Sequence, residues 1–232
     1  MKNLNKTKKL VIFGLGETAT LAYEYFTHDS EYEVAAFSVN EGYLTEKEFQ
    51  GLPVVAFEKI EEYYSPEKYN AFVAIAGGQL NRQRTRVYRQ MKEKGYVLAS
   101  YVSSRAFVWH NVEIGENCFI FENNTLQPFT KIGNNVVMWS GNHLGHRSVI
   151  KDNCFITSHV VISGFCEIGE NTYIGVNSSI ADNVKVAEDN YLAMGAVVSK
   201  KTQPNSVYRG NPAQRNKIVS AKAFCGVLGE TE

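Results

Sequence analysis

The chain has 232 residues with 24 basic and 24 acidic side chains, so its formal net charge is zero. This balance leaves no polybasic surface for nucleic acid or for a membrane. No apolar run approaches the roughly 20 residues that a membrane-spanning helix needs. The length suits one large domain or two modest ones, and we expect neither nucleic-acid binding nor membrane insertion.

The first hundred residues alternate apolar runs with helical patterns. Residues 9–14 predict a buried strand, and an amphipathic helical pattern follows through Phe26. Further short strands are predicted at 34–39, 52–56, 72–76 and 97–101, with a charged amphipathic helix at 79–94. Strands that alternate with helices indicate an open parallel sheet, so residues 1–101 are predicted to form a Rossmann-like domain.

A glycine-rich turn ends the first predicted strand. It contains the candidate phosphate contacts Gly14, Gly16, Glu17 and Thr18. Glycines let the backbone approach a phosphate, and the first amides of a helix point at the anion. The acidic residue expected about 20 positions later in NAD-binding proteins is missing, which disfavours NAD. Another nucleotide could bind, with Ser38 and Asn40 as polar contacts.

A second glycine pair, Gly77 and Gly78, closes the predicted strand at 72–76, and Asn81 and Arg82 open the next helix. Ligands of parallel sheets bind beyond the carboxyl ends of the strands, so we expect these four residues to face the same crevice. The alternative for the glycine pair is a tight turn without a ligand.

A six-residue repeat runs through the second half of the chain. Every sixth residue from Val102 to Val198 is aliphatic, and a mostly small residue follows four positions later. A helix has a period of 3.6 and an ordinary strand a period of 2, so neither produces this pattern. A hexapeptide period predicts a parallel β-helix with 18-residue coils over residues 102–203.

The four cysteines do not predict a disulfide framework. Cys118 and Cys154 are two coils apart, about 10 Å by strand spacing, which is too far for a disulfide. Cys166 falls on another side of the helix and Cys225 in the tail. Buried, reduced thiols fit a cytoplasmic protein.

Two histidines, His143 and His146, lie three residues apart and are expected at turn positions around Leu144. A metal site needs a third ligand, and none is evident nearby, so we expect no metal. An unperturbed imidazole titrates at about pH 6.5 and can act as a general base. Gly164 follows His146 by 18 residues, so its amide is expected beside the imidazole as a free donor for an acyl oxygen. The simpler alternative is a pair of surface polar residues.

The segment after the last regular coil is basic in a neutral chain, and residues 204–232 are expected to form a cap and tail. From Ala213 onward we expect a short helix that covers the end of the solenoid. Asn124 and Asn142, 18 residues apart, are expected to form a structural amide ladder. The candidate contacts for coenzyme A are Gly164, Met194, Gly195, Lys200, Arg209, Asn211, Pro212, Arg215 and Lys217.

The unbroken hexads, the sequence Leu-Gly-His-Arg-Ser-Val-Ile around His146, and Arg-Gly-Asn-Pro-Ala at 209–213 carry a resemblance. Together they resemble the left-handed β-helix acyltransferases. The two-part layout with Gly-Leu-Gly-Glu-Thr-Ala at 14–19 is similar to bacterial N-acetyltransferases of nucleotide-linked amino sugars, grouped with sialic acid O-acetyltransferases.

The resemblance implies a homotrimer with acetyl-CoA as acyl donor, held between neighbouring β-helices. It implies that the sugar nucleotide binds the N-terminal domain and that the histidine at 146 is the base. The glycine amide at 164 would meet the acetyl carbonyl. Many relatives have an acidic residue directly after this histidine, whereas this chain has Arg147.

The function expected from these features is acetyl transfer to the amino group of a nucleotide-linked amino sugar, in bacterial surface-glycan biosynthesis. The amine would attack the thioester directly, without a covalent enzyme intermediate. O-acetylation of a sialic acid or a related sugar is the second possibility. A β-helix scaffold without activity is the third.

Overall fold

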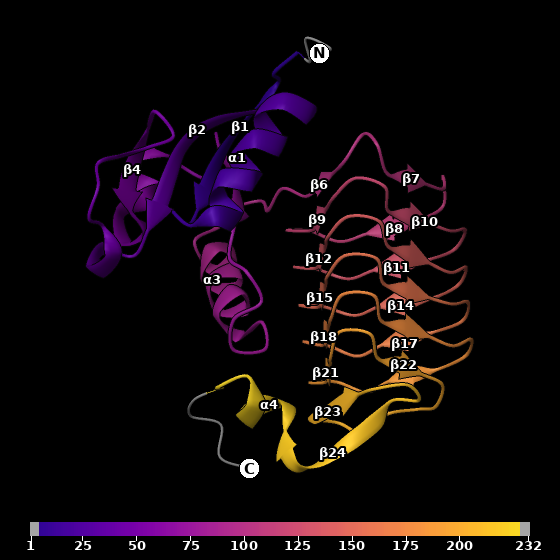
Figure 1. Ribbon diagram of the computed structural model, residues 1–232. Coiled ribbons are helices and arrows are strands. Elements are labelled where there is room, and N and C mark those ends of the chain that lie inside the picture. Colours follow the sequence, from indigo (N-terminus) through magenta and orange to yellow (C-terminus); the bar gives the residue numbers. More distant parts are fainter. Residues whose placement is uncertain (1–4, 228–232) are drawn as a thin grey trace. The chain divides into compact units, whose positions relative to one another are not determined.

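The computed structural model describes residues 5–227, which form two compact units. The first unit contains the chain up to Ala76 together with Arg86–Tyr101, and the second contains Gly77–Thr85 together with the chain from Val102 onward. Figure 1 shows the elements of both. The short internal segment 77–85 therefore belongs to the second unit.

The first unit is built on a five-stranded sheet of order β3-β4-β2-β1-β5. Its strands are β1 (Lys8–Phe13), β2 (Tyr32–Val39), β3 (Glu48–Phe49), β4 (Leu52–Ala56) and β5 (Asn70–Val73). Its helices are α1 (Glu17–Asp29), η1 (Glu41–Tyr43), η2 (Phe57–Lys59) and α2 (Ile60–Tyr63), and most of α3 (Arg82–Glu93) also belongs to it. The predicted Rossmann-like architecture is confirmed.

Helices cover both faces of this sheet. Phe26 of α1 packs edge-on against Phe72, with ring centroids 5.0 Å apart. On the other face, Val11 and Phe13 share a buried cluster with Met91 of α3. Successive strand residues point to opposite faces, so the apolar residues 10–13 of β1 are buried on both sides of the sheet.

Three details of the first hundred residues differ from the predictions. Strand β3 pairs antiparallel with β4, because Gln50 and Gly51 both have positive φ (51° and 74°) and close a two-residue hairpin. Of the strand predicted at 97–101, one bridge to the sheet remains, from Ala71 to Leu98, and Tyr101 begins strand β6 (Tyr101–Val102) of the second unit's sheet. The helix predicted from residue 79 begins at Arg82, because residues 79–81 have left-handed backbone conformations.

The second unit is a left-handed parallel β-helix with three sheets, as predicted. One sheet contains β6 (Tyr101–Val102), β9 (Phe119–Ile120), β12 (Val137–Met138), β15 (Phe155–Ile156), β18 (Tyr173–Ile174), β21 (Tyr191–Leu192), β23 (Ser206–Arg209) and β24 (Gln214–Ser220). The second contains β7 (Phe107–Val108), β10 (Thr125–Leu126), β13 (His143–Leu144), β16 (Val161–Ile162), β19 (Ser179–Ile180) and β22 (Val197–Val198). The third contains β8 (Glu113–Ile114), β11 (Lys131–Ile132), β14 (Val149–Ile150), β17 (Glu167–Ile168) and β20 (Lys185–Val186).

From β7 to β22 the strand register repeats at 18 residues without a slip. His143 pairs with Val161 and Leu144 with Ile162, and the same offset recurs in the three sheets up to the β21–β23 pair, where Tyr191 pairs with Val207. The second residue of each strand points inward, so Leu144 and Ile162 are buried in one continuous core. Cys118, Cys154 and Cys166 are buried and reduced, as expected, and Cys225 is half-buried.

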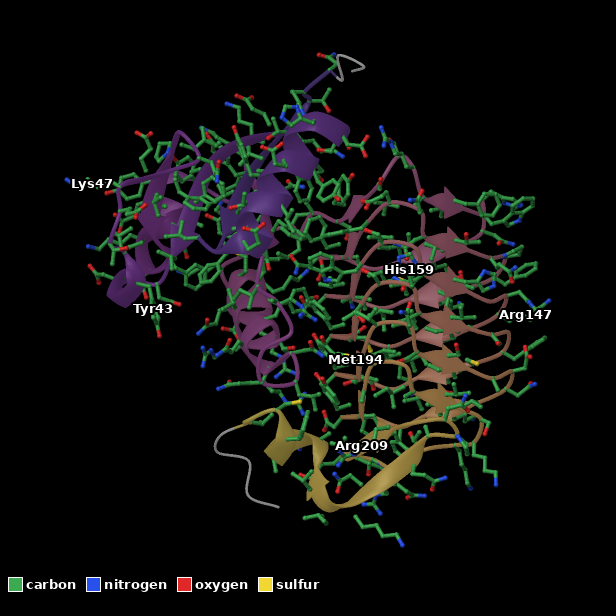
Figure 2. All side chains as sticks on the ribbon, in the orientation of Figure 1. Tyr43, Lys47, Arg147, His159, Met194 and Arg209 are labelled. Carbon is green, nitrogen blue, oxygen red and sulfur yellow. The ribbon has the colours of Figure 1, made fainter. Side chains whose placement is uncertain are left out.

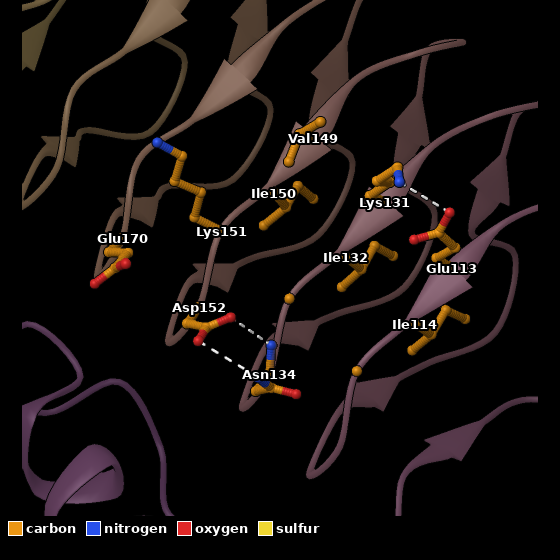
Figure 3. A pocket seen from close by; sticks show the side chains of 12 residues that line it. Glu113, Ile114, Lys131, Ile132, Asn134, Val149, Ile150, Lys151, Asp152 and Glu170 are labelled. Atoms are coloured by element: carbon orange, nitrogen blue, oxygen red, sulfur yellow. Dashed lines mark hydrogen bonds and ion pairs between the residues drawn. The ribbon is translucent and has the colours of Figure 1, made fainter.

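The outward residues give the three sheets different chemistry. The third sheet presents a charged face, on which Lys131 pairs with Glu113 at 2.9 Å (Figure 3). Beside it, the backbone amide of Asn134 donates to Asp152 at 2.7 Å. The first sheet instead stacks aromatic rings, with Tyr173 nearly parallel to Tyr191 at 4.9 Å. The second sheet carries His143 on strand β13.

The C-terminal end differs from the prediction in its order of elements. Residues from Gln214 onward form strand β24, which pairs antiparallel with β23, and only then does the short helix α4 (Ala221–Phe224) begin. The last coil leaves the backbone groups of its edge unpaired, and a returning strand satisfies them more fully than a helix could.

The amide ladder also lies elsewhere. Asn124 and Asn142 donate to backbone carbonyls of their turns, including Trp139. The ladder is formed by Asn117, Asn135 and Asn153, whose side-chain amides are joined by two 2.9 Å hydrogen bonds.

Candidate active site

His146 occupies the turn between β13 and β14, and its side chain is exposed. We define the histidine corner as the turns 127–130, 145–148, 163–166 and 181–184, which stack along one edge of the β-helix. The turn is tight because Gly145 lies directly on the next coil, where a Cβ would be 2.5 Å from the carbonyl carbon of Ser163. The tight stacking sets the position of the residue that follows.

Three contacts hold the imidazole. Its Nδ1 lies 3.3 Å from Oε1 of Gln127, one coil earlier. The ring of Phe165 meets it edge-on, with centroids 5.0 Å apart. On the next coil its Cε1 approaches Gly164 so closely that a Cβ there would lie 2.7 Å away. His146 and Gly164 therefore lie side by side on neighbouring coils, as the 18-residue spacing predicted.

The amide of Gly164 is not free, which corrects the expectation of an available donor. It donates to Oδ1 of Asp182 at 2.9 Å. Asp182 lies 18 residues after Gly164 and so occupies the same turn position one coil later. The carboxylate of Asp182 therefore accepts the hydrogen bond that the Gly164 amide of the preceding coil donates.

Three bulky residues of the histidine corner have left-handed backbone conformations. Phe129, Arg147 and Phe165 have φ values of 64°, 58° and 58°. The third position of most turns has this conformation, and Asn, Asp or Gly usually occupies it, because other side chains cost energy there. The remaining exception is His159, on another corner. Arg147 projects from the β-helix and its guanidinium covers the Phe129 ring at 4.5 Å (Figure 2).

His143 is not at a turn, contrary to the prediction. It is the outward residue of strand β13, half-buried between its register partners Thr125 and Val161. The adjacent Leu144 points inward, so alternation directs His143 to the outer face of the sheet. His143 and His146 therefore belong to different surfaces, a strand face and a corner.

The candidate coenzyme A residues lie in the later part of the β-helix. Met194 and Gly195 form the turn between β21 and β22, and both are exposed. Lys200 follows β22, and the rest belong to the β23–β24 hairpin: Arg209, Asn211, Pro212, Arg215 and Lys217.

The hairpin separates the basic side chains. Arg215 pairs with Tyr208 in register, and Lys217 is two residues further on the same strand. Arg209 pairs with Gln214 and therefore points to the opposite face of the hairpin. The hairpin thus separates Arg209 from Arg215, whose Nε donates to the Ser206 hydroxyl at 2.9 Å. The register shifts beyond Arg215, on the part of β24 that contains Lys217.

The glycine turn of the first unit has a structural glycine and an open one. Gly14 has φ +126°, and a Cβ there would lie 2.8 Å from the Ala74 carbonyl oxygen. Gly16 precedes helix α1, and no heavy atom beyond its neighbours lies within 4 Å of a Cβ built there. Glu17 and Thr18 are the first residues of the helix.

The two polar contacts expected near this turn are less accessible than predicted. Ser38 is fully buried, and its hydroxyl has no hydrogen-bond partner among the described residues. Asn40 donates to Glu58 at 3.2 Å. Ser38 does hold the turn by its backbone, because its carbonyl accepts from the Gly14 amide at 2.9 Å.

The segment 77–85 contacts the β-helix. Gly77 lies against the aromatic face, where a Cβ would be 3.1 Å from the Tyr173 ring, whereas Gly78 is exposed. Asn81 is buried and donates to the carbonyl of Asn171. Arg82 forms an ion pair with Asp189 at 2.6 Å. That these residues also contact a nucleotide stays a prediction.

Sequence reasoning missed Arg84, the largest of the fully buried side chains. Its guanidinium reaches the carbonyl oxygens of Asn135, Asn153 and Cys154 at 3.1–3.2 Å. Burial lowers the pKa of Arg84 to about 10 and raises that of the Cys154 thiol to about 12. Arg84 is one of several charged residues in an amphipathic helix pattern, so nothing in the sequence marked its side chain as buried in the β-helix.

Gln127 was also missed, although the period could have found it. Neighbours in a β-helix lie about 18 residues away in both directions, and Gln127 is 19 residues before His146. Among residues 5–227, no group of three or more His, Cys, Asp or Glu side chains is placed to hold a metal ion. In the same range, no helix is long and apolar enough to cross a membrane.

The comparisons with known proteins agree with this fold. The bacterial transferase hexapeptide (six repeats) family matches residues 165–200. The acetyltransferase domain of PglB from Neisseria gonorrhoeae has a TM-score of 0.80 at 21% identity, covering 90% of this chain and 100% of that one. The chain has the fold of the hexapeptide-repeat acetyltransferases.

A second structure is equally similar. PerB from Caulobacter crescentus, solved in complex with CoA and GDP-perosamine, has a TM-score of 0.79 at 22% identity and covers 90% of this chain and 97% of that one. WeeI from Acinetobacter baumannii aligns less closely, with a TM-score of 0.54 at 19% identity over 90% of this chain and 100% of that one. Both matches span the two units of the chain.

Proposed function

We propose that this protein transfers the acetyl group of acetyl-CoA to the amino group of a nucleotide-linked amino sugar. The observation that carries the proposal is the imidazole of His146, exposed at a turn yet held by Gln127, Phe165 and Gly164. A fixed, accessible base is what direct acyl transfer to an amine requires. The PerB structure, with CoA and GDP-perosamine bound to the same fold, supports this choice of substrates.

The reaction needs one base and one oxyanion donor. The amine attacks the thioester carbonyl, and His146 Nε2 takes the proton that the nitrogen loses. The carbon–sulfur bond then breaks, and the thiolate of coenzyme A leaves with a proton from the imidazolium. The products are the N-acetylated sugar nucleotide and free coenzyme A.

The oxyanion donor in this proposal is the amide of Gly164. It donates to Asp182 in the structure, so donation to an acetyl carbonyl requires the Asp182 side chain to turn away. Asp182 is exposed, so water can solvate its carboxylate when it leaves. In the free protein the Asp182 carboxylate thus accepts from the Gly164 amide, and the carbonyl oxygen of acetyl-CoA displaces it on binding.

The acetyl-CoA site is proposed along the later coils, with the phosphates near the exposed side chains of Lys200, Arg215 and Lys217. These cations are concentrated in a chain without net charge, which favours an anionic ligand there. Met194 and Gly195 are exposed on the turn between β21 and β22, where an extended pantetheine chain would meet apolar surface.

The nucleotide is proposed to bind the turn before helix α1. Gly16 provides no capping side chain, and nothing in the described chain occupies the space next to it. An open helix N-terminus attracts a phosphate through its amides and dipole. Because no packing requirement explains Gly16, close approach of a ligand is the better account of a glycine there.

A homotrimer is part of the proposal. The β-helix exposes a strip of apolar side chains beside the histidine corner, each between 42% and 53% exposed: Phe107, Trp109, Phe129, Val161 and Phe165. Large apolar side chains that are exposed close together are typical of an interaction surface. The charged third sheet, with its Glu–Lys pairs, is suited to water instead. We place the protein in the bacterial cytoplasm, in surface-glycan biosynthesis.

The experiment is an assay of thiol release from acetyl-CoA with UDP-, dTDP- and GDP-linked amino sugars, and with sialic acid. Acetylation of an amino sugar nucleotide, with product mass increased by one acetyl group, supports the proposal. Acetylation of sialic acid alone would make it an O-acetyltransferase, and no acetylation of any acceptor would favour a scaffold. In the same panel, Gly16→Trp should weaken sugar-nucleotide binding and leave acetyl-CoA binding unchanged.

A further inference from the structure

We infer that Gln127 is a positioning residue that fixes the tautomer of His146, in the place of the carboxylate that Arg147 does not provide. This inference rests on the proposed function for its catalytic meaning, but its structural content does not. The amide of Gln127 reaches two groups of His146, the backbone N–H at 2.8 Å and the ring Nδ1 at 3.3 Å, through the same oxygen, Oε1.

The backbone contact decides which way the Gln127 amide faces. The N–H of His146 is a donor, so the atom opposite it must be the carbonyl oxygen of Gln127 and not its NH₂ group. That oxygen can only accept hydrogen bonds. The ring nitrogen that approaches the same oxygen must therefore be the protonated one, which places the proton of the neutral imidazole on Nδ1.

Fixing the proton on Nδ1 has a direct chemical consequence. It leaves the lone pair on Nε2, the nitrogen that a general base uses toward a substrate. An imidazole in the other tautomer presents an N–H to the amine and cannot accept its proton. Gln127 thus selects the competent form of the base before a substrate arrives.

The backbone of Gln127 is held in place by two hydrogen bonds. Its backbone N–H donates to Leu144 at 3.1 Å, and its carbonyl accepts from the Thr130 hydroxyl at 2.9 Å. Pro128 follows and restricts the backbone of Gln127 to extended conformations. The charged groups described around the corner are already engaged: Arg147 covers Phe129, and Asp182 accepts from Gly164.

The test measures the tautomer directly by long-range ¹H–¹⁵N correlation NMR on full-length protein labelled at histidine. The His146 signal is assigned by its loss in His146→Asn. We expect the Nδ1–H tautomer in the wild type, its loss in Gln127→Met, which keeps the side-chain length without the acceptor, and its retention in Gln127→Glu. Gln90→Met on helix α3 is the matched control and should leave the His146 signals unchanged.

With an acceptor sugar in hand, Gln127→Met should lower kcat by about tenfold to a hundredfold with KM nearly unchanged, and Gln127→Glu should recover most of the loss. An Nε2–H tautomer in the wild type, or an unchanged tautomer in Gln127→Met, would overturn the inference. If the tautomer behaves as expected but no sugar nucleotide is acetylated, the positioning role stands and the proposed function fails.

Discussion

Two corners of the same β-helix have the same backbone conformation but differ in the type and burial of their side chains. At the histidine corner, three of the four left-handed positions carry Phe129, Arg147 and Phe165, all exposed, and only the last carries an asparagine, Asn183. At the arginine corner, which we define as the turns 115–118, 133–136 and 151–154, the equivalent positions are Asn117, Asn135 and Asn153, all buried. The comparison shows that the same left-handed turn position can be occupied by asparagine, which adopts that backbone conformation at low cost, or by bulky residues, for which it is strained.

The energetics of the two corners differ accordingly. Asparagine tolerates a left-handed conformation at low cost and, at the arginine corner, joins its neighbours in a ladder of 2.9 Å hydrogen bonds. Phenylalanine and arginine gain no such bond and cost more in the same conformation. Strain that persists at exposed side chains around a histidine points to a functional reason for those residues.

The largest expected effect comes from removing the base. His146→Asn should lower turnover by about a hundredfold to ten-thousandfold, because a positioned general base contributes that range. The loss should appear in kcat more than in KM, since the proton leaves only as the new bond forms. Steady-state kinetics with acetyl-CoA and the preferred acceptor would measure it.

His143→Ala is the matched comparison and should cost less, because His143 lies on a strand face and not at the corner with Gly164. The reverse order, with His143 indispensable and His146 dispensable, would move the base to the strand. The contrast between the two corners would then lose its functional meaning.

The arginine corner should give the largest loss of stability. Arg84→Met removes a buried guanidinium and leaves the carbonyls of Asn135, Asn153 and Cys154 without that donor. Unsatisfied buried polar groups cost about 1–3 kcal/mol each, with partial compensation by relaxation, so we expect a loss of about 2–4 kcal/mol. Urea unfolding of the full-length protein would measure it.

Arg89→Met, an exposed arginine of the same helix, is the control and should change the unfolding midpoint little. Well below the unfolding transition, Arg84→Met should keep its turnover, because this corner contributes packing rather than chemistry. An equal destabilisation in both variants would show that Arg84 has no special place in the β-helix.

A smaller effect should come from the contact between the imidazole and the next coil. In Gly164→Ala the new Cβ would lie 2.7 Å from Cε1 of His146, so the ring must move. Because a displacement of about 1 Å can cost about a hundredfold, we expect turnover to fall by about tenfold to a hundredfold. The unfolding midpoint should change little, since the ring can rotate toward solvent.

The parallel change at another corner should do the opposite. In Gly141→Ala the Cβ would meet the ring of His159 at 2.8 Å, but Gly141 also has φ +78°. Stability should fall there while turnover is retained. Unchanged turnover in Gly164→Ala, measured under saturating acceptor, would show that the ring position next to Gly164 does not matter.

The sequence predicted the β-helix far better than the site. A six-residue period is a local pattern that every coil repeats, so strands such as β13 and β16 could be placed within a residue. The antiparallel β3–β4 hairpin depended on positive φ at Gln50, which no apolar pattern reveals. The same limit applied to helix α3, whose start is set by left-handed residues 79–81.

To predict the site, one has to know which hydrogen-bond donors already have an acceptor within the protein. Register alone placed Gly164 next to His146, but the bond from its amide to Asp182 depends on a side-chain direction. The contact from Gln127 to His146 likewise depends on a side-chain direction that the period does not specify. Arg84 is the extreme case, because charged residues in an amphipathic helix are normally solvated and here one is buried completely.

The smallest effect is expected from a substitution that makes the histidine corner resemble the arginine corner at one position. Arg147→Asn places the residue type found at most left-handed positions where φ is 58°. Relief of the strain should stabilise by about 1 kcal/mol, and loss of the stack on Phe129 should cost about 0.5 kcal/mol. We therefore expect a net gain of about 0.5 kcal/mol in the free energy of unfolding.

Arg147→Lys separates these two contributions. It keeps the backbone cost and replaces the planar guanidinium, which lies 4.5 Å from the Phe129 ring, with a weaker partner for an aromatic face. Its stability should fall slightly below that of the wild type while Arg147→Asn rises above it, as urea unfolding midpoints would show. If Arg147→Asn were instead less stable than Arg147→Lys, the stack would outweigh the backbone strain. The two corners would then differ in side-chain packing and not in the strain that they tolerate.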